Sequence, residues 1–126
     1  MLLSINEHDN RPIYLQIINQ IKEQVRSGTL QPGEELPSVR EMADSLGINM
    51  HTVRSAYLKL RDQGIIKLHL GRRARIAKHL PQRDINLETD IKVRLNELIT
   101  DALLTGIPLN DLRIIINQQL DQLKKD

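Results

Sequence analysis

The spacing of apolar residues predicts three helices in the first half of the chain. From Pro12, which suits the first position of a helix, to Gly28, a natural stop, apolar side chains recur every three or four residues. They are Ile13, Ile17, Ile18, Ile21 and Val25. This spacing places them on one face of a helix, so we expect that face to be buried.

A second helix is predicted between Ser38 and Gly47. Because Ser38 stands three residues before Glu41, we expect a capping box, in which the Ser38 hydroxyl accepts from the Glu41 amide and the Glu41 carboxylate returns to the Ser38 amide. The buried stripe of this helix is Val39, Met42, Ala43 and Leu46. Leu30 and Leu36, on either side of a Pro-Gly turn, are expected to point inward.

The third helix follows after only two residues. Two short helices joined by so tight a turn must cross steeply, which needs a small residue at the crossing and a positive φ in the turn. Ala43 and Gly47 meet these needs, and Val53 plugs the crossing. This is the pattern of a DNA-binding helix-turn-helix. The alternative is an ordinary helical hairpin whose polar residues are merely solvated.

A β-hairpin with a basic tip is predicted directly after the third helix. Its alternating inward positions are Ile66, Leu68 and Leu70 on the first strand and Ala74 and Ile76 on the second. A turn at Gly71, Arg72 and Arg73 joins them. A helix-turn-helix followed by such a hairpin is a winged helix, whose wing contacts phosphates or a narrow groove. The alternative is a solubilising edge, because charged residues also protect exposed strands.

Two more helices are predicted after a break at Leu80, which divides the chain into residues 1–80 and 81–126. The first apolar stripe is Ile91, Leu95, Leu98, Ile99, Ala102 and Leu103, and the second is Leu109, Leu112, Ile115, Ile116, Leu120 and Leu123. A helical hairpin cannot bury both stripes alone, so we expect a twofold dimer interface. Its expected residues are Leu95, Leu98, Ile99, Leu112, Ile115, Ile116 and Leu120. The alternative is that this tail packs back on the first domain.

Charge favours a polyanionic partner for the first domain. Residues 1–80 carry 12 Lys and Arg against 8 Asp and Glu, net +4, and residues 81–126 carry 6 against 8, net −2, which together give the formal +2. The segment 67–78 holds five basic residues and no acid. The chain has no cysteine, no long apolar run and no signal-peptide pattern, so we expect a cytoplasmic protein without membrane contact.

A long stretch of the sequence resembles a known family. "GTLQPGEELPSVREMADSLGINMHTVRSAYLKLRDQGII" is similar to the DNA-binding domain of GntR-type bacterial transcription regulators, over about residues 10 to 77. "RPIYLQI", "HTVRSAYLKL" and the small remainder resemble the short YtrA-like branch. The resemblance implies a mainly α winged helix-turn-helix, with three helices and a two-stranded wing before the two-helix tail. It also implies a small repressor, often of a transporter operon beside its own gene.

The residues expected to touch DNA lie on the third helix, the start of the second and the wing. Arg54 can reach two acceptors on one guanine, and Arg40 can reach a base edge or a phosphate. Polar residues at a helix N-terminus favour a phosphate, although His51 could be a plain surface residue. With the positions that the resemblance implies, the set is Arg40, Asn49, His51, Thr52, Arg54, Ser55, Gly71, Arg72 and Arg73.

Two departures from the family limit what the resemblance transfers. Many relatives have Arg at the position of Met50, so one common guanine contact is missing and base preference cannot be carried over. Relatives often have a second Gly and a Thr where this chain has Arg73 and Ala74, which predicts a stiffer and more cationic wing tip.

Other classes of function fit the sequence poorly. It lacks a phosphate-binding glycine loop and any close Ser, His and carboxylate arrangement, so we expect no enzyme and no cofactor. A metal sensor is one alternative, but His51, His69 and His79 fit no ligand spacing, and we expect no metal. A protein-interaction winged helix is the other, and the basic recognition face argues against it. The expected partners are a palindromic double-stranded operator and a second copy of the chain, with the effector unknown.

Overall fold

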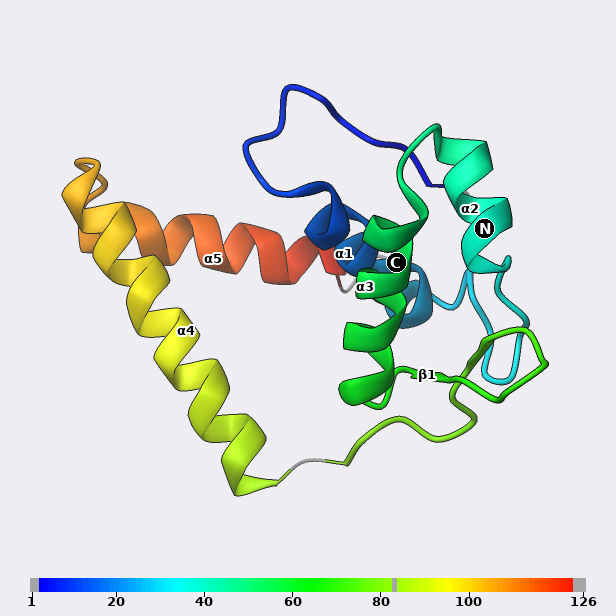
Figure 1. Cartoon of the computed structure of the whole chain (residues 1–126). Coiled ribbons are helices and arrows are strands. Elements are labelled where there is room, and N and C mark those ends of the chain that lie inside the picture. Colours follow the sequence, from blue (N-terminus) through cyan, green and yellow to red (C-terminus); the bar gives the residue numbers. More distant parts are fainter. Residues whose placement is uncertain (1–2, 83, 124–126) are drawn as a thin grey trace. The chain divides into compact units, whose positions relative to one another are not determined.

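The computed structural model describes residues 3–82 and 84–123 and forms two compact units, residues 1–81 and 82–126. The helices of the first unit are α1 (Ile13–Ser27), α2 (Val39–Leu46) and α3 (Met50–Asp62), and its strands are β1 (Ile66–Lys67) and β2 (Arg75–Ile76) (Figure 1). The second unit contains α4 (Ile85–Leu104) and α5 (Leu109–Leu123). No helix within the described residues is long and apolar enough to cross a membrane.

The core of the first unit is mostly aliphatic and lies mainly between α1 and α3. Ile17, Ile18 and Ile21 of the expected α1 face are buried, Val25 is half-buried, and Ile13 is exposed at the end of the helix. Leu30 and Leu36 point inward, as predicted, and are 1% exposed. The other buried members are Met42, Ala43, Val53, Ala56, Tyr57, Leu60, Ile66, Ala74 and Ile76.

The helix-turn-helix has the predicted signals at its ends. The Ser38 hydroxyl accepts from the Glu41 amide at 3.1 Å, and Gly47 ends α2 with φ 67°. The second half of the predicted capping box is wrong, because the Glu41 carboxylate pairs with Arg73 instead of returning to the Ser38 amide. One brace was not predicted: the Tyr57 hydroxyl donates to the Pro37 carbonyl at 2.6 Å, which ties α3 to the chain entering α2.

The segment before α1 is held by two glutamines of that helix. The Ser4 amide donates to Gln20 Oε1 at 3.1 Å, and Gln20 Nε2 donates back to the Ser4 carbonyl at 2.6 Å. Asn6 and Gln16 repeat this reciprocal pair at 2.9 and 3.1 Å. Gln16 is 4% exposed, and its hydrogen bonds offset the cost of burying an amide.

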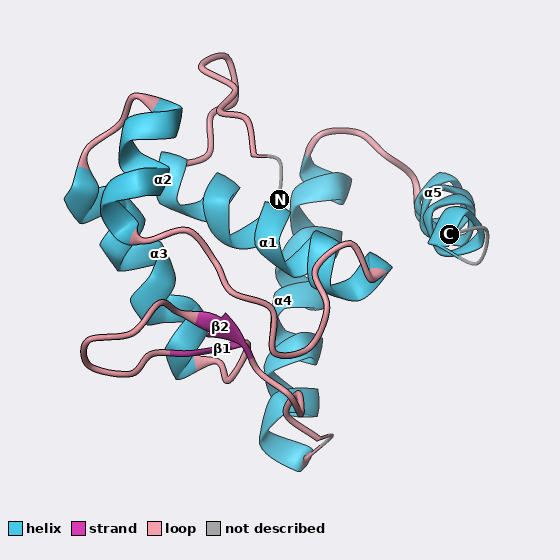
Figure 2. Ribbon diagram, turned by 90° about the vertical axis from the view of Figure 1, so that its right-hand side faces the viewer, coloured by secondary structure: helices cyan, strands magenta, loops and turns pink. Residues whose placement is uncertain are grey.

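The wing is shorter and more elaborate than predicted. β1 and β2 pair antiparallel with Ile66 opposite Ile76 and Lys67 opposite Arg75 (Figure 2). A third segment, which the sequence did not indicate, joins the other edge of β2: Glu35 forms a bridge to Arg75, and the Leu36 amide donates to the Ala74 carbonyl at 2.8 Å.

The expected course of the wing tip is wrong in two respects. Leu70 was predicted to point inward but is fully exposed, because the two-residue strands end before it. The turn was predicted at Gly71 to Arg73, but the Arg72 amide donates to the His69 carbonyl, so Leu70 and Gly71 form its centre. Gly71 has φ 75°, which favours glycine at that position.

The second unit is a helical hairpin that opens away from its turn (Figure 1). Asp84 caps α4 by accepting from the Leu87 amide at 2.8 Å, and Gly106, with φ 91°, follows the C-cap residue Thr105 in the turn to α5. Among its described residues only Ala102 and Leu112 are buried, both 7% exposed. Of the expected dimer residues, Leu112 is therefore already enclosed by its own chain, and Ile99 and Ile116 are half-buried. The exposed ones are Leu95, Leu98, Ile115 and Leu120.

Candidate nucleic-acid interface

One face of α3 is free of the core and carries polar side chains. Val53 is 0% exposed, whereas His51, Arg54 and Ser55 are exposed and Thr52 is half-buried. The buried and exposed positions alternate with the period of a helix, so α3 is held from one side only. Arg54 forms no ion pair within the described residues, and its guanidinium remains available to an acceptor outside the chain.

The start of α3 uses two of the expected DNA-contacting residues for its own structure. Asn49 Oδ1 accepts from the His51 amide at 2.7 Å, which is an N-cap. The Ser55 hydroxyl donates to the His51 carbonyl at 2.9 Å. Asn49 therefore keeps its NH₂ group as a donor, and Ser55 keeps only acceptor capacity, so their capacity to contact phosphate is unequal.

The fold brings the wing tip beside the start of α2. A groove of about 340 Å³ is lined from α2 and its cap by Ser38 and Val39 and from the wing by Gly71, Arg72 and Arg73. Arg40 lies exposed in the first turn of α2. Residues more than 30 positions apart thus share one surface.

Arg73 is engaged in an ion pair within the unit. Its Nη1 donates to Glu41 Oε2 at 2.9 Å, and its Nη2 donates to Glu41 Oε1. The hydrogen bond from Arg73 lowers the pKa of the Glu41 carboxyl, and the same bond raises the pKa of Arg73. No local pattern in the sequence indicates this pair, because its members are 32 residues apart. Arg72 has no such partner within the described residues.

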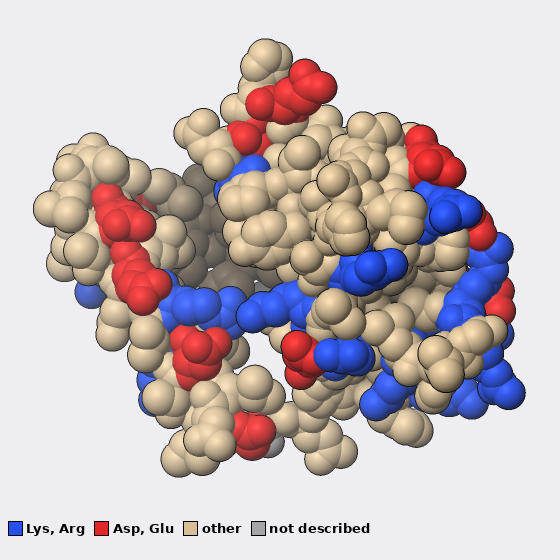
Figure 3. All heavy atoms as spheres, in the orientation of Figure 1, with Lys and Arg blue, Asp and Glu red and all other residues tan. Residues whose placement is uncertain are grey.

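Lysine and arginine side chains gather on the side of the unit formed by α2 and the wing (Figure 3). Within residues 3–82 and 84–123, no three His, Cys, Asp or Glu side chains are placed to hold a metal ion. The first unit offers an exposed arginine on α3, a cationic loop beside the start of α2 and backbone amides at helix starts. These are groups that bind phosphates and base edges.

Comparisons with known proteins agree with this chemistry. Residues 13–76 match the model of a family described as bacterial regulatory proteins, gntR family. The chain is 38% identical over 112 residues to the HTH-type transcriptional repressor YtrA of Bacillus subtilis, covering 88% of this chain and 86% of that protein. The family and this relative are transcription regulators, not enzymes.

Solved structures extend the similarity to the tail. A transcriptional antiterminator from Listeria monocytogenes superposes with a TM-score of 0.86 at 31% identity, covering 98% of this chain and 92% of that one. YtrA from Sulfolobus acidocaldarius superposes with a TM-score of 0.62 at 37% identity, covering 77% of this chain and 99% of that one. The DNA-binding domain of AraR in complex with operator ORX1 superposes with a TM-score of 0.52 at 25% identity, covering 61% of this chain and 92% of that one.

Proposed function

The chain belongs to the gntR family of bacterial regulatory proteins, and from this membership we propose that it represses transcription as a homodimer on a palindromic operator. It is a DNA-binding transcription regulator with a winged helix. The proposal of a homodimer on a palindromic operator rests on one observation. The two units expose surfaces of different chemistry, a polar and cationic surface on the first unit and an apolar surface on the second.

We propose that α3 lies in the major groove and the wing beside it. Arg54 supplies base recognition, because it is long, forked and without an ion-pair partner among the described residues. Arg40, His51 and Thr52 hold the backbone, together with the NH₂ group of Asn49. On the wing, Arg72 supplies the phosphate contact. The similarity to an operator-bound AraR domain supports this placement.

The dimer is supported by the apolar surface of the second unit. Thirteen large hydrophobic residues of α4 and α5 are exposed, against five in the described part of the first unit. A single helix pair that leaves such surface in water is marginal by itself, since helices gain most of their stability from burying an apolar face. Association with a second copy would cover the same surface on both chains.

The proposed target follows from the symmetry and from the relatives. A twofold dimer places two copies of α3 on two half-sites, so the operator is expected to be palindromic. By its YtrA-like resemblance, the chain would act in the cytoplasm on a transporter operon.

Selection of bound duplexes from a random pool tests the proposal in one experiment. Enrichment of an inverted repeat, with a light-scattering mass of twice 14.5 kDa, is the expected result. Enrichment of a single unrepeated site by a monomer would contradict the dimer, and absence of enrichment would contradict operator binding.

A further inference from the structure

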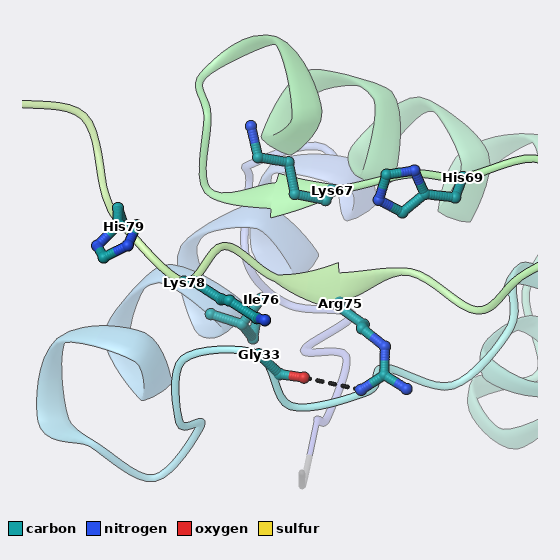
Figure 4. Close-up of a pocket in the computed structure, with 7 residues that line it drawn as sticks. All are labelled: Gly33, Lys67, His69, Arg75, Ile76, Lys78 and His79. Atoms are coloured by element: carbon teal, nitrogen blue, oxygen red, sulfur yellow. Dashed lines mark hydrogen bonds between the residues drawn. The ribbon is translucent and has the colours of Figure 1, made fainter.

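A cavity of about 480 Å³ lies at the base of the wing, outside the face assigned to DNA recognition. Three cationic side chains line it, Lys67, Arg75 and Lys78, and two imidazoles, His69 and His79, complete its polar wall (Figure 4). Its volume lies within the range of about 300–1,000 Å³ that is usual for small-molecule sites.

The cationic residues of this cavity are only partly neutralised. Arg75 Nη2 donates to Glu35 at 2.7 Å, and its Nη1 donates to the Gly33 carbonyl at 2.9 Å. Lys67 and Lys78 form no ion pair within the described residues. The cavity therefore carries two positive charges that the protein itself does not balance.

The register of the wing places two of the cavity's cationic side chains side by side, which lowers the stability of the sheet. Lys67 lies directly opposite Arg75 in the antiparallel pair, and like charges in that position destabilise a sheet. A charge arrangement that lowers the stability of the sheet indicates a functional role. An anion bound beside these two side chains would lower that cost, because it would balance their charge.

Lys78 is placed by packing as well as by charge. A Cβ on Gly33 would lie 3.8 Å from Lys78 Cγ and 3.9 Å from its Cε, so the lysine stem crosses this glycine closely (Figure 4). Gly33 itself has φ 80°, a conformation that other residues rarely adopt. A Cβ at these distances would make ordinary van der Waals contact, so the Lys78 stem lies against this turn, and it is the positive φ that favours glycine at position 33.

We propose that this cavity binds a phosphate group. The phosphate comes either from a small phosphorylated molecule or from the backbone of DNA flanking the operator. Lys67 and Lys78 supply the charge, and His69 and His79 supply ring nitrogens that can donate hydrogen bonds.

Nuclear magnetic resonance of the whole chain tests the site without DNA. Sodium phosphate, and separately adenosine monophosphate, is titrated at constant ionic strength, and the amide shifts of Gly33, Lys67 and Lys78 are followed. Saturable shifts centred on these residues are expected. The double variant Lys67→Gln, Lys78→Gln should weaken binding on the order of tenfold. Lys92→Gln, which removes the same charge from α4 and does not line the cavity, should leave binding unchanged.

A second arm identifies the source of the phosphate. If DNA supplies it, the double variant lowers the slope of log affinity against log salt by up to about two in phosphate-free buffer, and Lys92→Gln does not. If a small molecule supplies it, that slope stays unchanged while the phosphate-induced shifts are lost. The proposal is overturned if phosphate causes no saturable shifts and the slope is also unchanged. Because the first arm contains no DNA, its result does not depend on operator recognition.

Discussion

Arg73 on the wing and Glu41 on α2 form a two-point ion pair that joins the wing to the helix-turn-helix. Both side chains are about half exposed, so the pair adds little to the free energy of folding. The ion pair instead fixes the position of the wing tip relative to α2, because a planar guanidinium is held by both carboxylate oxygens.

The two wing arginines should differ in their contribution to DNA affinity. Arg72→Ala should lower the slope of log affinity against log salt by about one, because a phosphate contact is lost. Arg73→Ala should lower it less, because its charge is already paired. Binding measured over a series of potassium chloride concentrations checks this. An equal loss for both variants would mean that the ion pair opens on DNA.

The ion pair also predicts a dependence of stability on pH. Arg73 lowers the pKa of Glu41 below its ordinary value of 4.5, so the stabilisation is present above pH 4.5 and is lost as the pH falls through the lowered value. The urea midpoints of the wild type and Glu41→Gln should differ slightly at pH 7 and converge in acid. A difference that persists at a pH low enough to protonate Glu41 in the folded protein would show that the carboxylate charge is not its cause.

The hydroxyl of Tyr57 should contribute to stability rather than to binding. Tyr57→Phe removes the donor to the Pro37 carbonyl and should lower the free energy of unfolding by about 1 kcal/mol. Urea denaturation measures this change, and operator affinity below the unfolding range should stay within twofold. Tyr14→Phe is the matched control, because that side chain is exposed. A large loss of affinity in folded Tyr57→Phe would place this residue in the interface.

Substitutions at Arg54 and Val53, neighbours on α3, should affect DNA recognition and folding respectively. Arg54→Ala should cost about 1–3 kcal/mol of binding and relax base preference at one position in each half-site. Thr52→Ala should weaken all sequences alike. Val53→Asp should unfold the domain, because that side chain is fully buried. Selection and thermal melting measure the two effects. Unchanged preference in folded Arg54→Ala would exclude α3 as the reading helix.

Charges placed on the exposed apolar surface of the tail should separate the dimer. Leu98→Glu with Ile115→Glu is expected to give monomers, with little loss of helix content because both side chains are exposed. Thr100→Glu, two residues along and on the other side of α4, should remain dimeric. Light scattering and circular dichroism measure both. Dimers in the double variant would exclude this surface as the interface.

The sequence predicted the helices well because their signals are local. Gly28, Gly47 and the Ser38 cap lie within a few residues of the ends that they define. The wing was predicted less accurately, because its third segment depends on pairing across about 40 residues, from Glu35 to Arg75. The alternation at Leu70 looked like a strand, but the hairpin separates there and backbone pairing no longer sets the direction of side chains.

The expected DNA-contacting set stays a prediction, and the sequence did not indicate that some of its members also make contacts within the domain. A cationic wing could be read from composition, but the engagement of Arg73 by Glu41 could not, because no local pattern links them. The same holds for Leu112, whose place in the apolar stripe did not reveal that its own chain encloses it.

The paired glutamines of α1 restrict how the N-terminal segment can change in length during evolution. Gln16 and Gln20 are one turn apart, about 6 Å along the helix, and they bind Ser4 and Asn6, which are about 7 Å apart in an extended chain. One residue inserted between Ser4 and Asn6 would break this match, so the Gln16 and Gln20 pairs could not both form. Natural insertions in homologous genes should therefore avoid this interval.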